Sequence, residues 1–143
     1  MTSYWKVYDA FLAKILEDEW GGWEKEQTEA DMRQLLESAI PHFKFPHISL
    51  DRSEEGFINE LGAEEIQILA TYMKCEWLER TILTWENVKP LYEERDFSQA
   101  NLIDKLRALL ELEKLSAAQL EGIYYRSIKG RSYKYSKLAG AGK

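Results

Sequence analysis

Apolar residues recur at steps of three and four along much of this chain, the spacing that gives a helix one apolar face. Ser3 can cap the first such segment, which we expect to end at the breaker pair Gly21-Gly22. Its apolar positions are Trp5, Tyr8, Phe11, Leu12, Ile15 and Leu16. Thr28 to Asp31 resembles a capping box that opens a second helix, and Pro41 ends that helix. The pattern therefore predicts two amphipathic helices before Pro41.

The spacing changes between Pro41 and Leu61, where apolar residues lie two or three positions apart. This predicts an extended segment or one short strand pair, held on the helices by its aromatic residues. The helical period returns from Ala63 to Thr84, and again after Ser98, which can cap a final helix. Asn87 to Asp96 is a short helix or a loop. We therefore predict a mainly α protein, a small helical bundle of about four to five helices with one short extended segment.

Length and composition limit the organisation of the chain. Its 143 residues, 45% of them hydrophobic, suffice for one domain with a core and are too few for two. A single cysteine, Cys75, excludes an intramolecular disulfide and predicts synthesis inside the cell. The first residues lack the pattern of a signal peptide, and no run approaches the roughly 18 to 20 apolar residues of a membrane span. We expect neither export by a signal peptide nor membrane insertion.

Positive charge is concentrated at the C-terminus. Gly122 to Lys143 holds six Lys and Arg residues and no acidic residue, whereas Met1 to Glu121 holds 13 against 25 Asp and Glu. We therefore divide the chain into a helical body, residues 1–121, and a basic, Tyr-rich C-terminal arm, residues 122–143, that lies on a partner. A disordered solubilising end is the alternative, which the tyrosines and isoleucines disfavour. The partner is protein or nucleic acid.

Two tryptophans around a glycine pair form an unusual loop, Trp20-Gly21-Gly22-Trp23. They either plug the end of the bundle or anchor a neighbouring molecule, because aromatic side chains are enriched in interface cores. Trp20 and Trp23 are therefore a candidate subunit interface.

The search for catalytic chemistry finds little. His42 and His47 need Asp51 or Glu54 to form a metal site, and a role on the loop surface is favoured. Cys75 lies within a helix, where a buried small side chain is more common than a nucleophile. Adjacent carboxylates on a helix point in different directions, so the acidic runs indicate solvated faces. We predict that the protein is not an enzyme and binds no metal or cofactor.

Several short stretches, taken in order, carry a resemblance to a known family. They are Tyr4 to Leu12, Leu36 to Ile40 before Phe43, Gly56 to Leu61 leading into Glu64 to Ala70, Glu76 to Leu78, Asp96 to Leu102 and the Tyr-rich basic end. In this order they resemble the head-to-tail connector, or head-completion, proteins of tailed bacteriophages of Gram-positive bacteria. The resemblance spans nearly the whole chain and consists of structural patterns.

The resemblance implies a virion structural protein of the phage neck, an adaptor made in the host cytoplasm. Such proteins form a ring, commonly a dodecamer, beneath the portal and leave a channel for double-stranded DNA. Other neck or tail-completion proteins are further partners. The arm then docks on the portal protein, with tyrosines as anchors and cations that meet acidic groups or DNA. The implied partner-binding residues are Tyr124, Tyr125, Arg126, Ile128, Lys129, Arg131, Tyr133, Lys134, Tyr135, Lys137 and Leu138.

Two other function classes stay open. A small helical regulator would bind nucleic acid through the basic end, with an affinity that falls as salt rises. An enzyme would need a site assembled from scattered carboxylates, such as a metal between His42, His47 and Asp51. For a connector, carboxylates in the lumen would repel the DNA backbone and let it pass, so we expect the acidic faces of the body to be partly lumenal.

Overall fold

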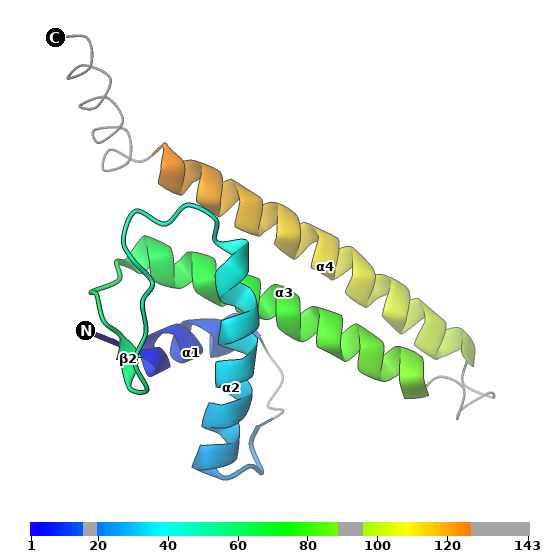
Figure 1. Ribbon diagram of the computed structural model, residues 1–143. Helices are drawn as coiled ribbons and strands as arrows, with labels where there is room; N and C mark the ends of the chain where they lie inside the picture. The colour runs from blue at the N-terminus through cyan, green and yellow to red at the C-terminus, as the bar shows by residue number, and fades with distance from the viewer. Residues whose placement is uncertain (16–19, 89–95, 127–143) are drawn as a thin grey trace, which may run out of the picture.

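The computed structural model describes residues 1–15, 20–88 and 96–126 of the chain. Its elements in order are β1 (Thr2–Ser3), α1 (Tyr4–Leu12), α2 (Lys25–Ala39), the 3-10 turn η1 (Ile40–His42), β2 (Gly56–Phe57), α3 (Ala63–Val88) and α4 (Asp96–Tyr125). The prediction of a small, mainly helical bundle is confirmed. Figure 1 shows α3 and α4 side by side as a long pair, with α1 and α2 packed across α3 toward one end of it.

The first helix begins as predicted and ends earlier. The Ser3 side chain caps α1 by accepting a hydrogen bond of 3.3 Å from the backbone N–H of Trp5. The helix stops at Leu12, whereas we expected it to reach Gly21-Gly22. A turn follows, in which Ile15 N–H donates to Leu12 C=O, and the Ile15 side chain is buried. The apolar spacing continues past the last helical residue because the Ile15 side chain, which lies in the turn, is also buried in the core.

The start of α2 corrects the predicted capping box. Glu24 and Gln27 form the box one turn earlier, with the Glu24 N–H donating to Gln27 Oε1 at 3.3 Å. The Thr28 hydroxyl lies within the first turn and donates to the Glu24 carbonyl. Asp31 cannot serve a cap because its carboxylate is bound by Arg80, at 2.6 and 3.0 Å. At the other end, Pro41 follows the helix within η1, as predicted.

A two-residue strand pair joins the N-terminus to the extended segment. Thr2 pairs with Phe57 and Ser3 with Gly56, so one strand lies in the expected region and the other precedes α1. A Cβ atom on Gly56 would lie 2.2 Å from the Thr2 carbonyl oxygen, so the close approach of the strands requires glycine. The Thr2 hydroxyl donates to the Asn59 carbonyl and accepts from the Leu61 N–H, which closes this end of the molecule.

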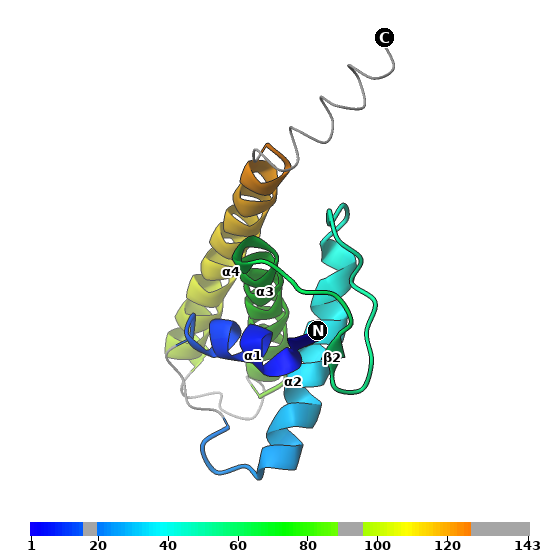
Figure 2. The same ribbon diagram turned by 90° about the vertical axis from the view of Figure 1, so that its left-hand side faces the viewer.

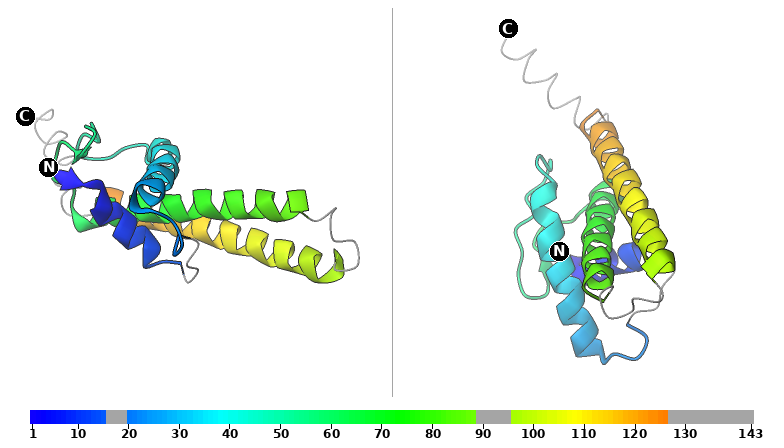
Figure 3. Two further views of the ribbon diagram at one scale, coloured as in Figure 1. Left: turned by 90° about the horizontal axis from the view of Figure 1, so that it is seen from below. Right: turned by 90° about the vertical axis from the view of Figure 1, so that its right-hand side faces the viewer.

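The long pair of helices forms the frame of the bundle. Figures 2 and 3 show α3 between α2 and α4, which explains why α3 has apolar residues on several faces. The largest fully buried side chains come from α1, α2, α3 and the β1–β2 pair, among them Phe11, Leu36, Phe57, Leu69 and Met73. Among the described residues, no helix is apolar over a stretch long enough to cross a membrane.

Candidate functional site

The described structure ends where the basic segment begins. Helix α4 continues through Gly122 to Tyr125, so the predicted boundary after Glu121 falls inside a helix. Of the implied partner-binding residues, the structure describes Tyr124, Tyr125 and Arg126. The others lie outside the described residues: Ile128, Lys129, Arg131, Tyr133, Lys134, Tyr135, Lys137 and Leu138. All six cations of the basic end lie at or after Arg126.

Tyr124 belongs to the buried face of α4. Ile103, Leu110, Ala117 and Tyr124 recur every seven residues, and each is at most 8% exposed. This heptad is visible in the sequence, but the basic, Tyr-rich composition after Glu121 led us to place Tyr124 in the arm. Leu102 and Leu109, each one residue before a member of this heptad, lie on the exposed side of α4.

The loop after η1 closes on the end of α4 in what we call the aromatic clamp: Phe43, Phe45, His47, Tyr124 and Tyr125. The Tyr124 ring stacks on the His47 imidazole, with centroids 4.3 Å apart, and meets the edge of Phe43 at 5.4 Å. The Tyr124 hydroxyl accepts a hydrogen bond of 2.7 Å from the His47 N–H. The Tyr125 hydroxyl accepts one of 3.2 Å from the Phe45 N–H. The clamp therefore fixes the last turn of α4 to the body.

A buried carboxylate completes the support of this end. Glu121 is 8% exposed, and its Oε2 accepts a hydrogen bond of 2.5 Å from the Tyr125 hydroxyl. The Tyr72 hydroxyl donates to the other oxygen, Oε1. Burial and the neighbouring Glu121 raise the pKa of Tyr125 to about 12 and also raise the pKa of Tyr72. Both phenols therefore stay protonated and can donate to Glu121 at neutral pH.

The two histidines lie on different tyrosines. His42 stacks on Tyr72, and its Nε2 lies 2.7 Å from Glu76 Oε1, whereas His47 stacks on Tyr124. Across the described ranges, no group of three His, Cys, Asp or Glu side chains is placed to hold a metal ion. His42 thus packs on the side of α3, and His47 packs on the last turn of α4.

The candidate subunit interface separates into two different environments. Trp20 is 7% exposed, packs its ring against Phe11 and donates from its indole N–H to Asp31 at 2.7 Å. Burial alone would raise the pKa of Asp31, but the hydrogen bonds from Arg80 and Trp20 outweigh it and lower that pKa. Trp20 therefore belongs to the core of this chain. Trp23 is 42% exposed and retains a surface for a neighbour.

Cys75 is only 5% exposed, on α3. Burial raises the pKa of its thiol to about 11, and the nearby Glu113 acts in the same direction. The thiol is therefore protonated and shielded at neutral pH, which is the environment of a packing residue.

The structure also contains a groove, away from the aromatic clamp, that was not predicted from the sequence. We call it the acidic groove; it has a volume of about 480 Å³ and lies between α1, α2 and the turn before β2. Its lining residues are Tyr4, Trp5, Tyr8, Glu26, Glu29, Ala30, Arg33, Glu54 and Glu55. The sequence signal was only partial, since Glu54-Glu55 reads as a solvated charged turn and the aromatic residues read as core.

Comparison with protein-family models, with curated proteins and with solved structures finds no match for this chain. The resemblance to phage connectors therefore depends on the order of sequence patterns.

Proposed function

We propose that the protein is a structural component of the bacteriophage neck that forms a ring under the portal and joins the DNA-filled head to the tail. The observation that carries the proposal is the separation of charge at the end of α4. The body before Gly122 has a net charge of −12, and the six cations begin at Arg126, directly after the aromatic clamp. An acidic body with a basic extension suits a subunit that binds a partner through its end.

The aromatic clamp fixes the base of the basic extension to the body. Tyr124 and Tyr125 are engaged within the body, so they support the base of the arm. Docking then depends on residues 127–143, in which Tyr133 and Tyr135 are the proposed anchors and the lysines and arginines the proposed charge contacts. A rigid base reduces the conformational freedom that docking must restrict, which favours affinity.

The acidic body also suits passage of DNA. A lumen lined with carboxylates repels phosphates, whereas a basic lumen would hold DNA through counterion release. The proposal therefore assigns the cations to the docking arm and leaves the channel acidic.

Electron microscopy of the full chain mixed with the portal ring encoded in the same genome tests this proposal. We expect an added layer of helical density, coaxial with the portal. An unchanged portal ring, or a genome without portal, terminase and major capsid genes beside this one, would contradict it. Binding to duplex DNA, with a salt dependence that matches the number of terminal cations, would instead support the nucleic-acid regulator.

A further inference from the structure

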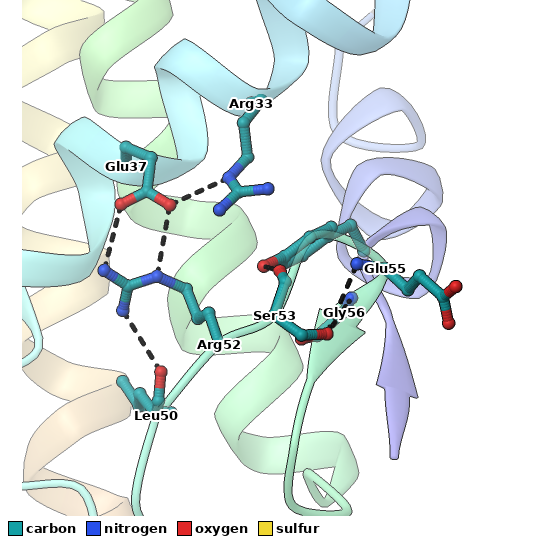
Figure 4. Close-up of polar contacts among 8 residues, drawn as sticks. Arg33, Glu37, Leu50, Arg52, Ser53, Glu55 and Gly56 are labelled. Atoms are coloured by element: carbon teal, nitrogen blue, oxygen red, sulfur yellow. Dashed lines mark hydrogen bonds and ion pairs between the residues drawn. The ribbon is translucent and has the colours of Figure 1, made fainter.

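The acidic groove combines aromatic rings with four carboxylates, of which only Glu29 has a cationic partner, Lys25. Within the described part of the chain, Glu26, Glu54 and Glu55 form no ion pair, and all three are exposed. The groove lining holds four carboxylates and one arginine, Arg33, whose guanidinium pairs with Glu37 at 2.8 Å; Arg52 also binds Glu37, at 3.0 Å (Figure 4). In the same view the Glu55 side chain points away from this cluster. The groove therefore has unmatched negative charge.

Tyr8 supplies an independent observation at the same groove. Its side chain lines the groove and is 3% exposed, yet its hydroxyl has no hydrogen-bond partner among the described residues. Buried hydroxyls are rarely left without a partner, since such a group loses its water without compensation. A donor that enters the groove could complete this hydrogen bond.

The rings already show what kind of donor fits. The Arg33 guanidinium lies over the Tyr4 ring, 4.2 Å from its centroid. The Trp5 indole N–H donates to Glu29 at 3.1 Å, and its ring meets the edge of Tyr8 at 5.3 Å. Rings of this type, with carboxylates beside them, favour an ammonium or guanidinium group. The chemistry of the groove is therefore that of a site for Lys or Arg side chains.

We propose that, in the free protein, the acidic groove binds residues 127–143 of a second copy of this chain. That segment carries Lys129, Arg131, Lys134, Lys137 and Lys143 with no acidic residue, so its charge is complementary to the groove. It also follows directly from the end of α4, where the described structure stops. A lysine or arginine of the segment would donate to the Tyr8 hydroxyl and pair with Glu54 and Glu55.

This contact joins two different surfaces of one chain, a groove and a terminal segment. Such a heterologous contact repeats from subunit to subunit and closes when the rotation between subunits permits a ring. The contact belongs to the free protein, in which no portal competes for residues 127–143, and the inference rests on the proposed function only for the later transfer of that segment to the portal. Failure of portal binding and failure of this contact are therefore separate results.

Zero-length carbodiimide cross-linking of the full chain tests the contact. In an equal mixture of unlabelled and heavy-isotope protein, we expect cross-links from Lys129, Lys134 or Lys137 to Glu26, Glu54 or Glu55, with mixed-isotope pairs among them. High salt should remove these cross-links. Pairs of a single isotope only would show that each chain fills its own groove. Cross-links spread over all exposed carboxylates, or none to the groove, would also overturn the proposal.

Sedimentation of full-chain variants gives the second readout. Glu54→Gln combined with Glu55→Gln should weaken self-association about fivefold, since each exposed pair contributes modestly. The matched control, Asp104→Asn with Glu111→Gln, removes two exposed carboxylates of α4 and should leave self-association unchanged. Tyr8→Phe should weaken self-association without lowering the melting temperature, because the hydroxyl has no partner within the chain. An equal effect of the control pair, or no effect of the groove variants, would overturn the proposal.

Discussion

The aromatic clamp and the acidic groove use the same kinds of side chain in opposite ways. At the clamp, Glu121 is buried and each of its oxygens accepts from a tyrosine hydroxyl. In the groove, Glu54 and Glu55 are exposed and the Tyr8 hydroxyl has no partner among the described residues. Polar groups whose hydrogen bonds are all formed within a packed site contribute to stability, whereas polar groups without partners can still bind a ligand. The comparison therefore assigns folding to the clamp and recognition to the groove.

The largest expected effect on stability comes from where the chain is truncated, after Glu121 or after Arg126. Removing residues 122–143 deletes Tyr124 and Tyr125, and we expect the free energy of unfolding to fall by about 3–5 kcal/mol, as for loss of a buried aromatic side chain. Removing residues 127–143 should change it by less than about 0.5 kcal/mol. Urea unfolding followed by tryptophan fluorescence measures both. Equal stability of the two truncated chains would show that the clamp does not support the fold.

Neutralising the buried carboxylate of Glu121 should lower the free energy of unfolding more than neutralising the exposed carboxylate of Glu55. Glu121→Gln replaces one of the two acceptor oxygens by a donor, so we expect a loss of about 1–3 kcal/mol in the free energy of unfolding. Glu55→Gln changes an exposed side chain and should have an effect within about 0.5 kcal/mol. Chemical unfolding of the two variants under the same conditions makes the comparison. A similar effect of both substitutions would remove the distinction between the two sites.

The turn that carries Glu54 and Glu55 depends on a glycine at its end. Gly56→Ala places a methyl group against the Thr2 carbonyl, and we expect a loss of about 1–3 kcal/mol. Gly22→Ala is the matched control, because no atom lies within 4 Å of the added Cβ. Thermal unfolding should show a lower melting temperature for the first variant only. An unchanged Gly56→Ala protein would mean that the strand pair is not needed to hold the groove.

Alkaline pH should affect both regions through their tyrosines. Burial raises the pKa of Tyr8 to about 12, and burial with Glu121 raises that of Tyr125 to about 12. Because unfolded tyrosine has a pKa of about 10, this part of the stability is present below pH 10 and is lost as the pH rises toward 12. Tyrosinate absorbance, recorded with circular dichroism, should show late titration coupled to unfolding. Titration of every tyrosine near pH 10 in a folded protein would contradict these shifts.

Helices and their caps were easier to predict from the sequence than the contacts between residues far apart in the chain. The helix at Ala63 and the cap at Ser3 were predictable because their signals are local. The boundary between body and arm was drawn after Glu121, inside α4, although the heptad that includes Leu110 and Tyr124 was present, because composition was given more weight than period. The groove could not be predicted, since Trp5, Glu29 and Glu54 meet only through tertiary packing.

Co-sedimentation with the portal ring tests the central claim, that the body folds alone and residues 127–143 carry the docking. The full chain should pellet with the ring, whereas a chain ending at Arg126, with the same melting temperature, should remain in the supernatant. A truncated chain that pellets as well as the full chain would contradict the account.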